Sequence, residues 1–275
     1  MSEPRSAIVL TSGGVDSVTT AFHVKRNLKA PQIILIFCDY RQRTYKYEEF
    51  CISAVGKALG APVKLIDLRW LGGLSTSLLT KPRVPIPETR EEDLWKPEEA
   101  KKRILKWWDV VRNLQLVTVG LAHAESIDLG RYLAEGKRDV WDVHIGIRRE
   151  TPVAMKDNTP EFIELMDKVA QQSTHFGDYH VYAPLITYDK DKVVDLGEEL
   201  GVPWEYTYSC YAGHGFTTIG GKKLPVHCGR CSNCRRRALA FQLSGVYDRS
   251  LYSKPPLDTV DYVKVGRVYT QKRAR

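Results

Sequence analysis

The hexapeptide Ser12–Ser17, which reads Ser-Gly-Gly-Val-Asp-Ser, constrains this chain more than any other segment because of what flanks it. The preceding run Ser6–Thr11 contains four consecutive apolar residues, a pattern typical of a strand that is buried on both faces. Apolar residues recur at helical spacing after the hexapeptide, beginning at Val18. A glycine-rich turn between a buried strand and a helix predicts an α/β fold, and it places backbone amides where the helix dipole favours an anion.

The same alternation of strand and helix continues along most of the chain. Further strands are predicted at Gln32–Phe37, Pro62–Leu68, Val140–Ile145 and Val181–Ile186, and helices at Tyr45–Leu59, Glu98–Ile127 in two pieces, Glu161–Gln172 and Lys192–Leu200. Two segments break the pattern: Trp70–Pro97 is predicted to be a long loop or lid, and Arg148–Pro160 to be irregular. The alternation predicts an α/β domain over residues 1–205, with a doubly wound, mostly parallel sheet covered by helices. After Gly201 the composition shifts to cysteine, glycine, histidine and arginine, which predicts a small metal-binding region over residues 206–275.

Composition excludes several classes of protein. Of the 275 residues, 43% are hydrophobic and 27% are charged, so the chain can bury a core and is not disordered by composition. The opening run Met1–Ser6 is polar, unlike a secretory signal, and no apolar run approaches the ~18 residues of a membrane span. We therefore expect a cytoplasmic protein with no membrane partner.

The formal net charge of +8 has two interpretations. It is typical of a protein that binds nucleic acid, or of one that attracts anionic nucleotides and pyrophosphate. The densest basic stretches are Arg235–Arg237 and Lys264–Arg275, and few aromatic residues interleave them. We favour the second interpretation, while a nucleic-acid partner stays open.

The residue types in the hexapeptide suit a nucleotide phosphate. Its two glycines let the backbone approach a phosphate closely, and its two serine hydroxyls add hydrogen-bond donors. Asp16 cannot bind a phosphate directly, so its natural role is to hold a Mg²⁺ ion that bridges the phosphates. The segment lacks the Lys-Ser/Thr pair of a Walker sequence. An ordinary tight turn is the alternative, but such a turn needs only one glycine and a capping residue.

Four of the six cysteines gather near the C-terminus, and clustered cysteines in a reducing compartment more often bind metal than form disulfides. Cys228, Cys231 and Cys234 form two overlapping C-x-x-C spacings, and Cys210 lies upstream. Four thiolates fit a closed tetrahedral zinc site, which is structural because no position stays open for water. The three-cysteine run also suits an iron–sulfur cluster, but Cys210 and a helix predicted to start near Cys234 favour zinc. Other residues of interest are His214 and His227, as alternative ligands, and Cys38 and Cys51, as core thiols.

The hexapeptide resembles the PP-loop of the ATP pyrophosphatases, which cleave ATP between its α and β phosphates. Together with the cysteine motif, it makes the chain similar to the 7-cyano-7-deazaguanine synthase family over almost its whole length. The further segments that carry the resemblance are Asp39–Arg43, Leu74–Glu88, Arg112-Asn113, Pro184-Leu185 with Asp189-Lys190, Thr207–Tyr211, and Cys228–Cys234 followed by Arg237.

The resemblance implies a fold like that of the adenine nucleotide alpha hydrolases and a reaction in three steps. The 7-carboxylate of 7-carboxy-7-deazaguanine attacks the α-phosphate of ATP to form an acyl adenylate, and ammonia displaces AMP to give the amide. A second ATP then activates the amide, and elimination gives the nitrile, in the biosynthesis of queuosine- and archaeosine-type deazapurines. Preorganised cations must stabilise the charge that develops on the phosphate.

The resemblance also implies roles for the matching residues. ATP binding is implied for Ser12, Gly13, Gly14, Asp16, Ser17, Asp39 and Gln42, catalysis for Asp16, Lys190 and Arg112, substrate binding for Asn113 and Asp157, and metal binding for Cys210, Cys228, Cys231 and Cys234. Lys190 and Arg112 are the candidate cations, against the alternative that each is a surface ion-pair partner. Asp157 is assigned hypothetically to the base edge, against the alternatives of a solvated loop residue or a helix cap.

The chain departs from the family pattern in the part expected to face the deazapurine. Val110-Val111 precede Arg112 where the family has Pro-Gly. An ungapped match puts Thr151 and Met155–Thr159 against the family's Asp and Tyr-Pro-Asp-Cys-Arg, so that only Asp157 matches. Two segments are also longer than usual in the family: Glu91–Trp107 and Ala212–Val226. The substrate and the amine acceptor are therefore less constrained by the sequence than the activation chemistry.

Four functions stay in competition. The first is a nitrile-forming synthase, and the second is an enzyme that makes the same adenylate but couples the deazapurine to a different amine, for instance on a protein. The third is a tRNA-modifying enzyme, although thiolating PP-loop enzymes need a reactive cysteine and the four clustered cysteines are predicted to bind metal. The fourth, a non-catalytic binding module, is disfavoured by the complete hexapeptide. The expected cofactors are ATP with Mg²⁺ and structural Zn²⁺, the expected partners are a small deazapurine acid and ammonia, and a homodimer stays open.

Overall fold

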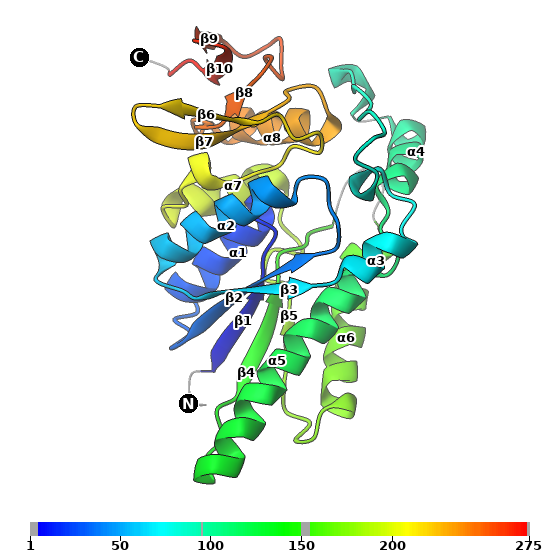
Figure 1. Cartoon of the computed structure of the whole chain (residues 1–275), viewed down its shortest axis with the longest axis vertical. Coiled ribbons are helices and arrows are strands. Elements are labelled where there is room, and N and C mark those ends of the chain that lie inside the picture. Colours follow the sequence, from blue (N-terminus) through cyan, green and yellow to red (C-terminus); the bar gives the residue numbers. More distant parts are fainter. Residues whose placement is uncertain (1–4, 95, 150–154, 274–275) are drawn as a thin grey trace.

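The core of the fold is a five-stranded parallel sheet with strand order β3-β2-β1-β4-β5, in a computed structural model that describes residues 5–94, 96–149 and 155–273 (Figure 1). Its strands are β1 (Ser6–Leu10), β2 (Ile33–Asp39), β3 (Val63–Asp67), β4 (Trp141–Ile145) and β5 (Val181–Tyr182). In register, Val9 of β1 lies between Leu35 of β2 and His144 of β4. The chain winds outward first on one side of β1 and then on the other, which confirms the predicted doubly wound sheet.

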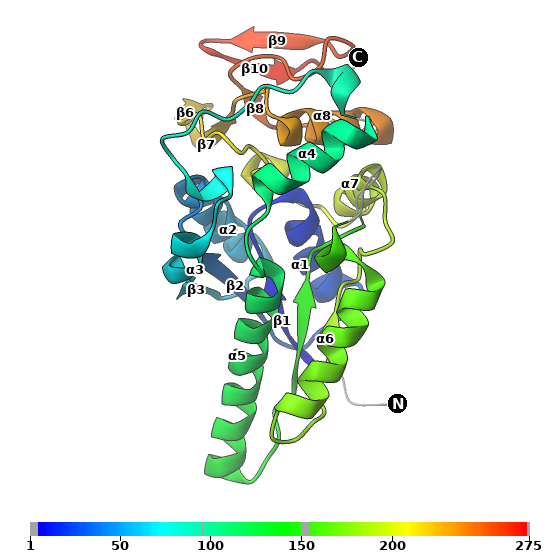
Figure 2. The ribbon, with the colours of Figure 1, turned by 90° about the vertical axis from the view of Figure 1, so that its right-hand side faces the viewer.

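Helices cover both faces of this sheet (Figures 1 and 2). Because side chains alternate along a strand, the apolar residues of β1 point to both faces and enter two separate cores. Ala7 and Val9 of β1 belong to one core, together with side chains of α1 (Val15–Arg26), α2 (Tyr45–Leu59) and α7 (Lys190–Glu199). Ile8 and Leu10 belong to the other core, with side chains of α5 (Arg112–Glu135) and α6 (Pro160–Ser173). All four of these β1 residues are buried, which explains why the strand reads as a continuous apolar run.

The C-terminal part of the chain forms a second, mixed sheet at one end of the molecule (Figure 1). Its strands, in spatial order, are β6 (Phe216–Ile219), β7 (Lys222–His227), β8 (Leu251–Tyr252), β10 (Val268–Gln271) and β9 (Tyr262–Val265). Between β7 and β8 the chain forms α8 (Ser232–Ser244), close to the helix expected near Cys234. The sequence analysis missed these strands, because they are short and lack a continuous apolar run. The predicted boundary between residues 205 and 206 stays a prediction.

The segment predicted to be a long loop is partly helical. It contains α3 (Arg69–Leu74) and the 3₁₀ turns η1 (Leu78–Thr80) and η2 (Glu91–Asp93), so the loop prediction is wrong at its start. Gly72, within α3, serves close packing: a Cβ on it would lie 2.0 Å from the carbonyl oxygen of Tyr40. The next predicted helix is indeed two helices, α4 (Pro97–Trp107) and α5, and Val111 between them has a left-handed φ of 45°.

Two further predictions agree with the structure only in part. β5 ends at Tyr182, earlier than predicted, and the region predicted to be irregular contains the 3₁₀ turn η3 (Lys156–Asn158). A similar turn, η4 (Trp204–Tyr206), precedes the metal-binding region. Thr151 lies outside the described residues. In the described ranges, no helix combines the length and the apolar character that crossing a membrane requires.

Candidate functional site

The winding of the first sheet changes direction between β1 and β4, and ligands of doubly wound folds bind in the crevice outside the carboxyl ends of such strands. The segments that follow the two strands meet at this point. A Cβ on Gly146, directly after β4, would lie 2.4 Å from the Cα of Ser17. Gly146 therefore lets the end of β4 touch the loop that follows β1, and a larger residue would push the two segments apart.

The hexapeptide forms a compact turn whose serine side chains hold it together. The backbone N–H of Ser12 donates to Oγ of Ser17 at 3.1 Å, and Oγ of Ser17 donates to the carbonyl oxygen of Gly14 at 3.2 Å. Gly13 has a φ of 73°, in the region that favours glycine. Because α1 begins directly after Gly14, the free amides of its first turn lie at the crevice, as an anion-binding loop requires.

The carboxylate of Asp16, in the first turn of α1, lies beside two cations. Nζ of Lys190 is 2.9 Å from Oδ2 of Asp16, and Nε of Arg148 is 3.6 Å from Oδ1. Burial acts to raise the pKa of Asp16, but the charges of Lys190 and Arg148 outweigh it and hold the pKa below its ordinary value. Asp16 is therefore ionised at neutral pH, and it joins α1 to the start of α7 and to the segment after β4.

A cavity of about 260 Å³ opens at the crevice. The predicted site residues that line it are Ser12, Gly14, Asp16, Ser17, Gln42, Arg112, Asn113, Asp157, Lys190 and Cys210. In the described part of the chain, Gly13 and Asp39 are not among its lining residues. The carboxylate of Asp39 instead accepts a hydrogen bond from Nε of Arg69 at 2.6 Å. The structure thus brings most of the predicted residues together, while the ATP-binding role of Asp39 stays a prediction.

Arg112, at the start of α5, is surrounded by acidic and phenolic groups. Its Nη1 is 3.5 Å from Oδ2 of Asp109, and its guanidinium carbon is 5.8 Å from the ring centroid of Tyr40. Burial acts to lower the pKa of Arg112, but the neighbouring Tyr40, Asp109 and Asp157 outweigh it and raise the pKa. Arg112 is therefore a fixed positive charge in a largely enclosed setting, which is unlike the setting of a surface ion-pair partner.

Asn113 holds the turn that presents Asp157. Its Nδ2 donates to Oδ1 of Asn158 at 2.9 Å and to the carbonyl oxygen of Asp157 at 3.3 Å. Its Oδ1 accepts a hydrogen bond from Nε of Arg112 at 3.3 Å. Since the polar atoms of the Asn113 amide are engaged within the protein, the geometry favours a positioning role for a residue that the sequence assigned to substrate binding.

Asp157 offers an acceptor to the cavity. Its buried Oδ1 has no hydrogen-bond partner among the described residues. Burial raises its pKa, and the charge of Arg112 opposes this effect without cancelling it. The residue that caps α6 is Thr159, whose Oγ1 accepts from the backbone N–H of Phe162 at 3.3 Å. The helix-cap alternative for Asp157 is therefore not what the structure has.

Glu48, in α2, lines the same cavity, although no motif pointed to it. Its Oε1 accepts from Oγ1 of Thr44 at 2.5 Å, and its Oε2 accepts from Nε2 of Gln42 at 3.1 Å. Gln42 also donates to the carbonyl oxygen of Cys38 at 2.9 Å and accepts from the backbone N–H of Tyr40 at 2.9 Å. Gln42 is thus engaged within the protein and orients Glu48, and its predicted role in ATP binding stays a prediction.

Helical spacing was the signal that could have found Glu48. It precedes Cys51, Ile52 and Val55 by three, four and seven residues, and these three side chains are buried. A glutamate on the buried stripe of a helix needs a reason, because burying a carboxylate costs free energy unless it is hydrogen-bonded or paired.

Trp107 reaches the cavity from the segment that is longer than usual in the family. Its ring and that of Tyr211 have centroids 4.5 Å apart and planes tilted by 36°. The buried Nε1 of Trp107 has no hydrogen-bond partner among the described residues. Both residues line the cavity. The extra helix α4 therefore brings an aromatic wall to the site, which the motifs did not predict.

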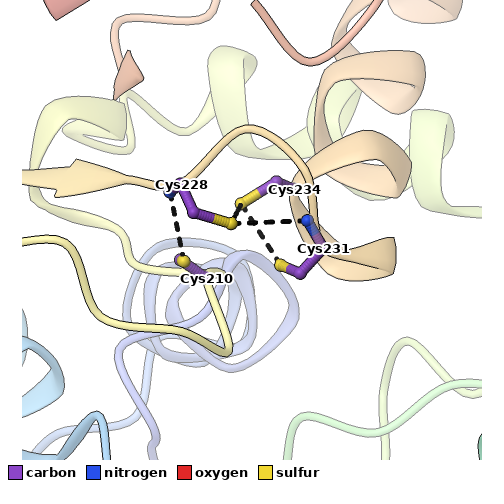
Figure 3. A group of neighbouring side chains, drawn as sticks. All are labelled: Cys210, Cys228, Cys231 and Cys234. Atoms are coloured by element: carbon purple, nitrogen blue, oxygen red, sulfur yellow. Dashed lines mark hydrogen bonds between the residues drawn. The ribbon is translucent and has the colours of Figure 1, made fainter. Parts of the chain in front are cut away.

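The four clustered cysteines come together as predicted (Figure 3). The four Sγ atoms, from Cys210, Cys228, Cys231 and Cys234, lie within 4.8 Å of one another. Backbone N–H groups point at the sulfurs: that of Cys228 donates to Sγ of Cys210 at 3.2 Å, and that of Cys231 donates to Sγ of Cys228 at 3.3 Å. Such donors favour thiolates, which are the form that binds a metal. The set fits a closed four-thiolate metal site, and no histidine belongs to it among the described residues.

Comparisons with known proteins agree with this geometry. Residues 6–245 match the family model described as "Queuosine biosynthesis protein QueC". The chain is 34% identical over 248 residues to the 7-cyano-7-deazaguanine synthase of Methanothermobacter thermautotrophicus, covering 90% of this chain and 98% of that protein. It is 30% identical over 255 residues to the enzyme of the same name from Pyrococcus horikoshii, covering 92% of this chain and 99% of that protein.

A solved structure, the U34-tRNA thiolase NcsA from Methanococcus maripaludis, is similar over 88% of this chain and 65% of its own chain, with 16% identity and a TM-score of 0.37. That similarity is too low to bear on function. The doubly wound sheet and the loop after its first strand are those of the PP-loop fold. The named relatives make the chain an enzyme of the ligase type. Within that class, the chain belongs to the QueC family.

Proposed function

We propose that this enzyme converts 7-carboxy-7-deazaguanine, ATP and ammonia into 7-cyano-7-deazaguanine through an acyl adenylate. The observation that carries the proposal is that one cavity is lined by residues of the phosphate loop, by Lys190 and Arg112, and by Asp157, whose buried Oδ1 has no hydrogen-bond partner among the described residues. Adenylation needs the first two, because the attack of one anion on another must be offset by fixed positive charge. A deazaguanine ring needs the third, because its ring N–H and exocyclic amine are donors.

The roles follow from the contacts. Ser12–Ser17 would hold the phosphates of ATP, and Asp16 would hold the Mg²⁺ that bridges them. Lys190, together with Arg148, would face the charge that develops on the α-phosphate. These two cations already lie against Asp16 in the structure, so the arrangement needs little reorganisation when an anion binds.

The other part of the cavity supplies recognition of the ring. Asp157 would accept hydrogen bonds from the edge of the deazapurine, and Asn113 would fix the turn that presents it. The aromatic wall formed by Trp107 and Tyr211 would cover one face of the ring. Arg112 would neutralise the carboxylate of the substrate before it is activated.

We propose zinc as the metal of the four-cysteine cluster. The four thiolates leave no ligand position for water, so the ion would stabilise the fold instead of taking part in the reaction. Helix α8 begins at Ser232, within the C-x-x-C-x-x-C run, which supports the proposal because a helix that starts there would present the sulfurs of Cys231 and Cys234 to one ion.

Mass spectrometry of the products tests the function. The enzyme is incubated with Mg-ATP, 7-carboxy-7-deazaguanine and ammonium, and we expect the amide and the nitrile together with AMP and pyrophosphate. The second candidate, which couples the deazapurine to another acceptor, would be favoured if pyrophosphate is released without either product and a different amine then gives a coupled product. The altered segment around Met155–Thr159 keeps that candidate in view. ADP and phosphate as the only nucleotide products would contradict the PP-loop chemistry.

A further inference from the structure

The proposed reaction needs a group that the phosphate loop and its cations do not supply. At neutral pH, ammonia is present mainly as ammonium, which has no lone pair to attack an acyl adenylate. The later conversion of the amide to the nitrile must also remove a proton from nitrogen. Both steps call for a proton acceptor beside the reacting carbon, and neither Lys190 nor Arg112 can act as one in its charged form.

Glu48 is the cavity carboxylate best placed for this task. Helix α2 passes so close to the phosphate loop that a Cβ on Gly13 would lie 3.1 Å from the carbonyl oxygen of Glu48 and 3.6 Å from its Cα. The Glu48 side chain lines the same cavity as Asp16 and Arg112. Glu48 therefore lies next to the phosphate loop and lines the cavity in which we propose that the adenylate forms.

Of the other acids that line the cavity, two are paired with a cation, and the third, Asp157, is the acceptor proposed for the edge of the ring. Asp16 is paired with Lys190, and Asp109 with Arg112. Glu48 is held by the neutral donors Thr44 and Gln42, one on each oxygen. Its orientation is therefore fixed without an ion pair to any of the described residues. A carboxylate oxygen has two lone pairs, and each oxygen of Glu48 keeps one beyond these bonds.

The charged and titratable groups around Glu48 come from several elements. Arg112 and Asp109 lie on the segment that leads into α5, Tyr40 follows β2, and Cys51 shares α2. Burial raises the pKa of Glu48, and the bonds from Thr44 and Gln42 and the charge of Arg112 only partly oppose this effect. The raised pKa makes Glu48 a stronger base, which suits the removal of a proton from ammonium.

We propose that Glu48 is the proton acceptor for the amine co-substrate, an inference that rests on the function proposed for this cavity. Ammonium gives one proton to the Glu48 carboxylate, and the nitrogen lone pair attacks the acyl carbon of the adenylate. The bond from carbon to the AMP oxygen then breaks, and the nitrogen releases a second proton to solvent as the amide forms. Glu48 then returns its proton to solvent. In the second adenylation the amide oxygen attacks the α-phosphate of ATP, pyrophosphate leaves, and one N–H proton goes to solvent. The last N–H proton passes to Glu48 while the bond from carbon to the AMP oxygen breaks and the carbon–nitrogen triple bond forms.

The test compares Glu48→Gln with the wild type in two half-reactions. Adenylation uses an ionised carboxylate and needs no base, so pyrophosphate exchange into ATP, dependent on 7-carboxy-7-deazaguanine, should stay within a few-fold of wild type. Amide and nitrile formation should fall by about 100-fold or more, the usual contribution of a general base. The neighbouring Glu49, which accepts from the hydroxyl of Tyr45 at 2.8 Å and is not among the cavity residues, gives the matched control Glu49→Gln, with both half-reactions unchanged.

An experiment with hydroxylamine distinguishes a Glu48 that acts as a base from a Glu48 that only supports the structure. It is largely uncharged at neutral pH, so it should form the hydroxamate in Glu48→Gln at nearly the wild-type rate, and the defect with ammonium should shrink as the pH rises. Loss of exchange together with product, or no rescue by hydroxylamine, would overturn this inference while leaving the proposed function in place. Absence of exchange in the wild type would overturn the proposed function and the inference with it.

Discussion

The backbone N–H of Tyr208 donates a hydrogen bond to the carbonyl oxygen of Gly13, with an N–O distance of 2.8 Å. This bond joins the segment that carries Cys210 to the phosphate loop. On its other side, the same segment is tied to α8, because Nδ2 of Asn233 donates to the carbonyl oxygen of Ser209 at 2.7 Å. The four-cysteine cluster therefore supports the phosphate loop and, through it, one wall of the cavity.

The first prediction follows from this support. Cys231→Ser should release the metal, lower the melting temperature and weaken ATP binding, since a structural metal contributes folding free energy and its cluster supports the segment bonded to Gly13. Metal analysis of the wild type should find about one zinc per chain, the number that one four-thiolate site holds. Isothermal titration with ATP measures the affinity.

Cys38→Ser is the matched control for this experiment. Cys38 is also a buried thiol, but it lies in β2 and does not belong to the cluster. The control should keep its metal even if it loses stability. A brown protein that contains iron and sulfide would show that the cluster binds an iron–sulfur centre, and zinc would then be the wrong metal.

The second prediction concerns the buried pair of Arg237 and Asp248. Nη2 of Arg237 is 3.0 Å from Oδ1 of Asp248, and Nη1 donates to Oγ1 of Thr207 at 2.8 Å, so the pair holds the segment that leads to Tyr208. Arg237→Met would leave the Asp248 charge buried and unpaired, and it should lower the free energy of unfolding by about 3–5 kcal/mol. Urea denaturation measures this, with Arg249→Met, at a surface pair, expected to change little.

The loss of unfolding free energy in Arg237→Met should depend on pH, and the pKa of Asp248 determines the direction. Burial acts to raise the pKa of Asp248, but Arg237 outweighs it and holds the pKa below its ordinary value. The pair therefore stabilises the fold above the unfolded pKa of about 3.9, and this contribution is lost as the pH falls through the lower folded value. The difference in stability between wild type and Arg237→Met should narrow at acid pH. A difference that widens there would contradict the assignment.

The parts of the fold that the sequence predicts well are those in which one local pattern determines the structure. β1, β2 and α2 follow from buried apolar runs and helical spacing, and Gly60, with a φ of 63°, ends α2 as expected. The second sheet was not found in this way, because its strands lack the continuous apolar run of β1, and β8 has only two residues. Four of its strands form two local hairpins, β6–β7 and β9–β10, and only β8 depends on pairing with strands farther along the chain.

In the candidate site, too, local motifs predicted some residues and missed those that tertiary packing brings there. The hexapeptide and the cysteines are local motifs, and most of their residues meet as predicted. Glu48 and Trp107 reach the cavity only through tertiary packing, from the first turn of one helix and the end of another. The sequence likewise could not distinguish the polar residues that face the cavity from those, such as Gln42 and Asn113, whose polar atoms are engaged within the protein.

The third prediction concerns Asp16. Asp16→Asn should reduce turnover by at least about 100-fold while the protein stays folded, because the amide is a poor ligand for Mg²⁺ and the phosphates would lose their bridging ion. Steady-state pyrophosphate release and circular dichroism measure the two effects. Asp195→Asn, at the surface pair with Lys192, is the control and should behave as wild type. Full activity of Asp16→Asn would remove the metal-binding role from this residue.

The last prediction separates recognition from structure at two neighbouring residues of one turn. Asp157 lines the cavity and has a buried oxygen with no hydrogen-bond partner in the part of the chain that the structure describes, whereas Thr159 caps α6. A hydrogen bond to a charged acceptor is worth about 1.5–3 kcal/mol, or roughly ten- to a hundredfold in affinity. Asp157→Ala should weaken binding of 7-carboxy-7-deazaguanine by that factor and leave ATP affinity and melting temperature nearly unchanged. Thr159→Ala should do the reverse, losing about 1 kcal/mol of stability with intact affinity.

The pH dependence of binding gives a second measurement on the same residue. Burial raises the pKa of Asp157, so the ionised acceptor is lost at a higher pH than for an exposed aspartate. Affinity for the deazapurine should therefore weaken as the pH falls through this raised pKa, and Asp157→Asn, which cannot titrate, should not show that step. Calorimetric titration across the acid range measures both proteins. Equal pH profiles, or a variant that loses stability but keeps its affinity, would mean that Asp157 serves the turn and that another group reads the edge of the ring.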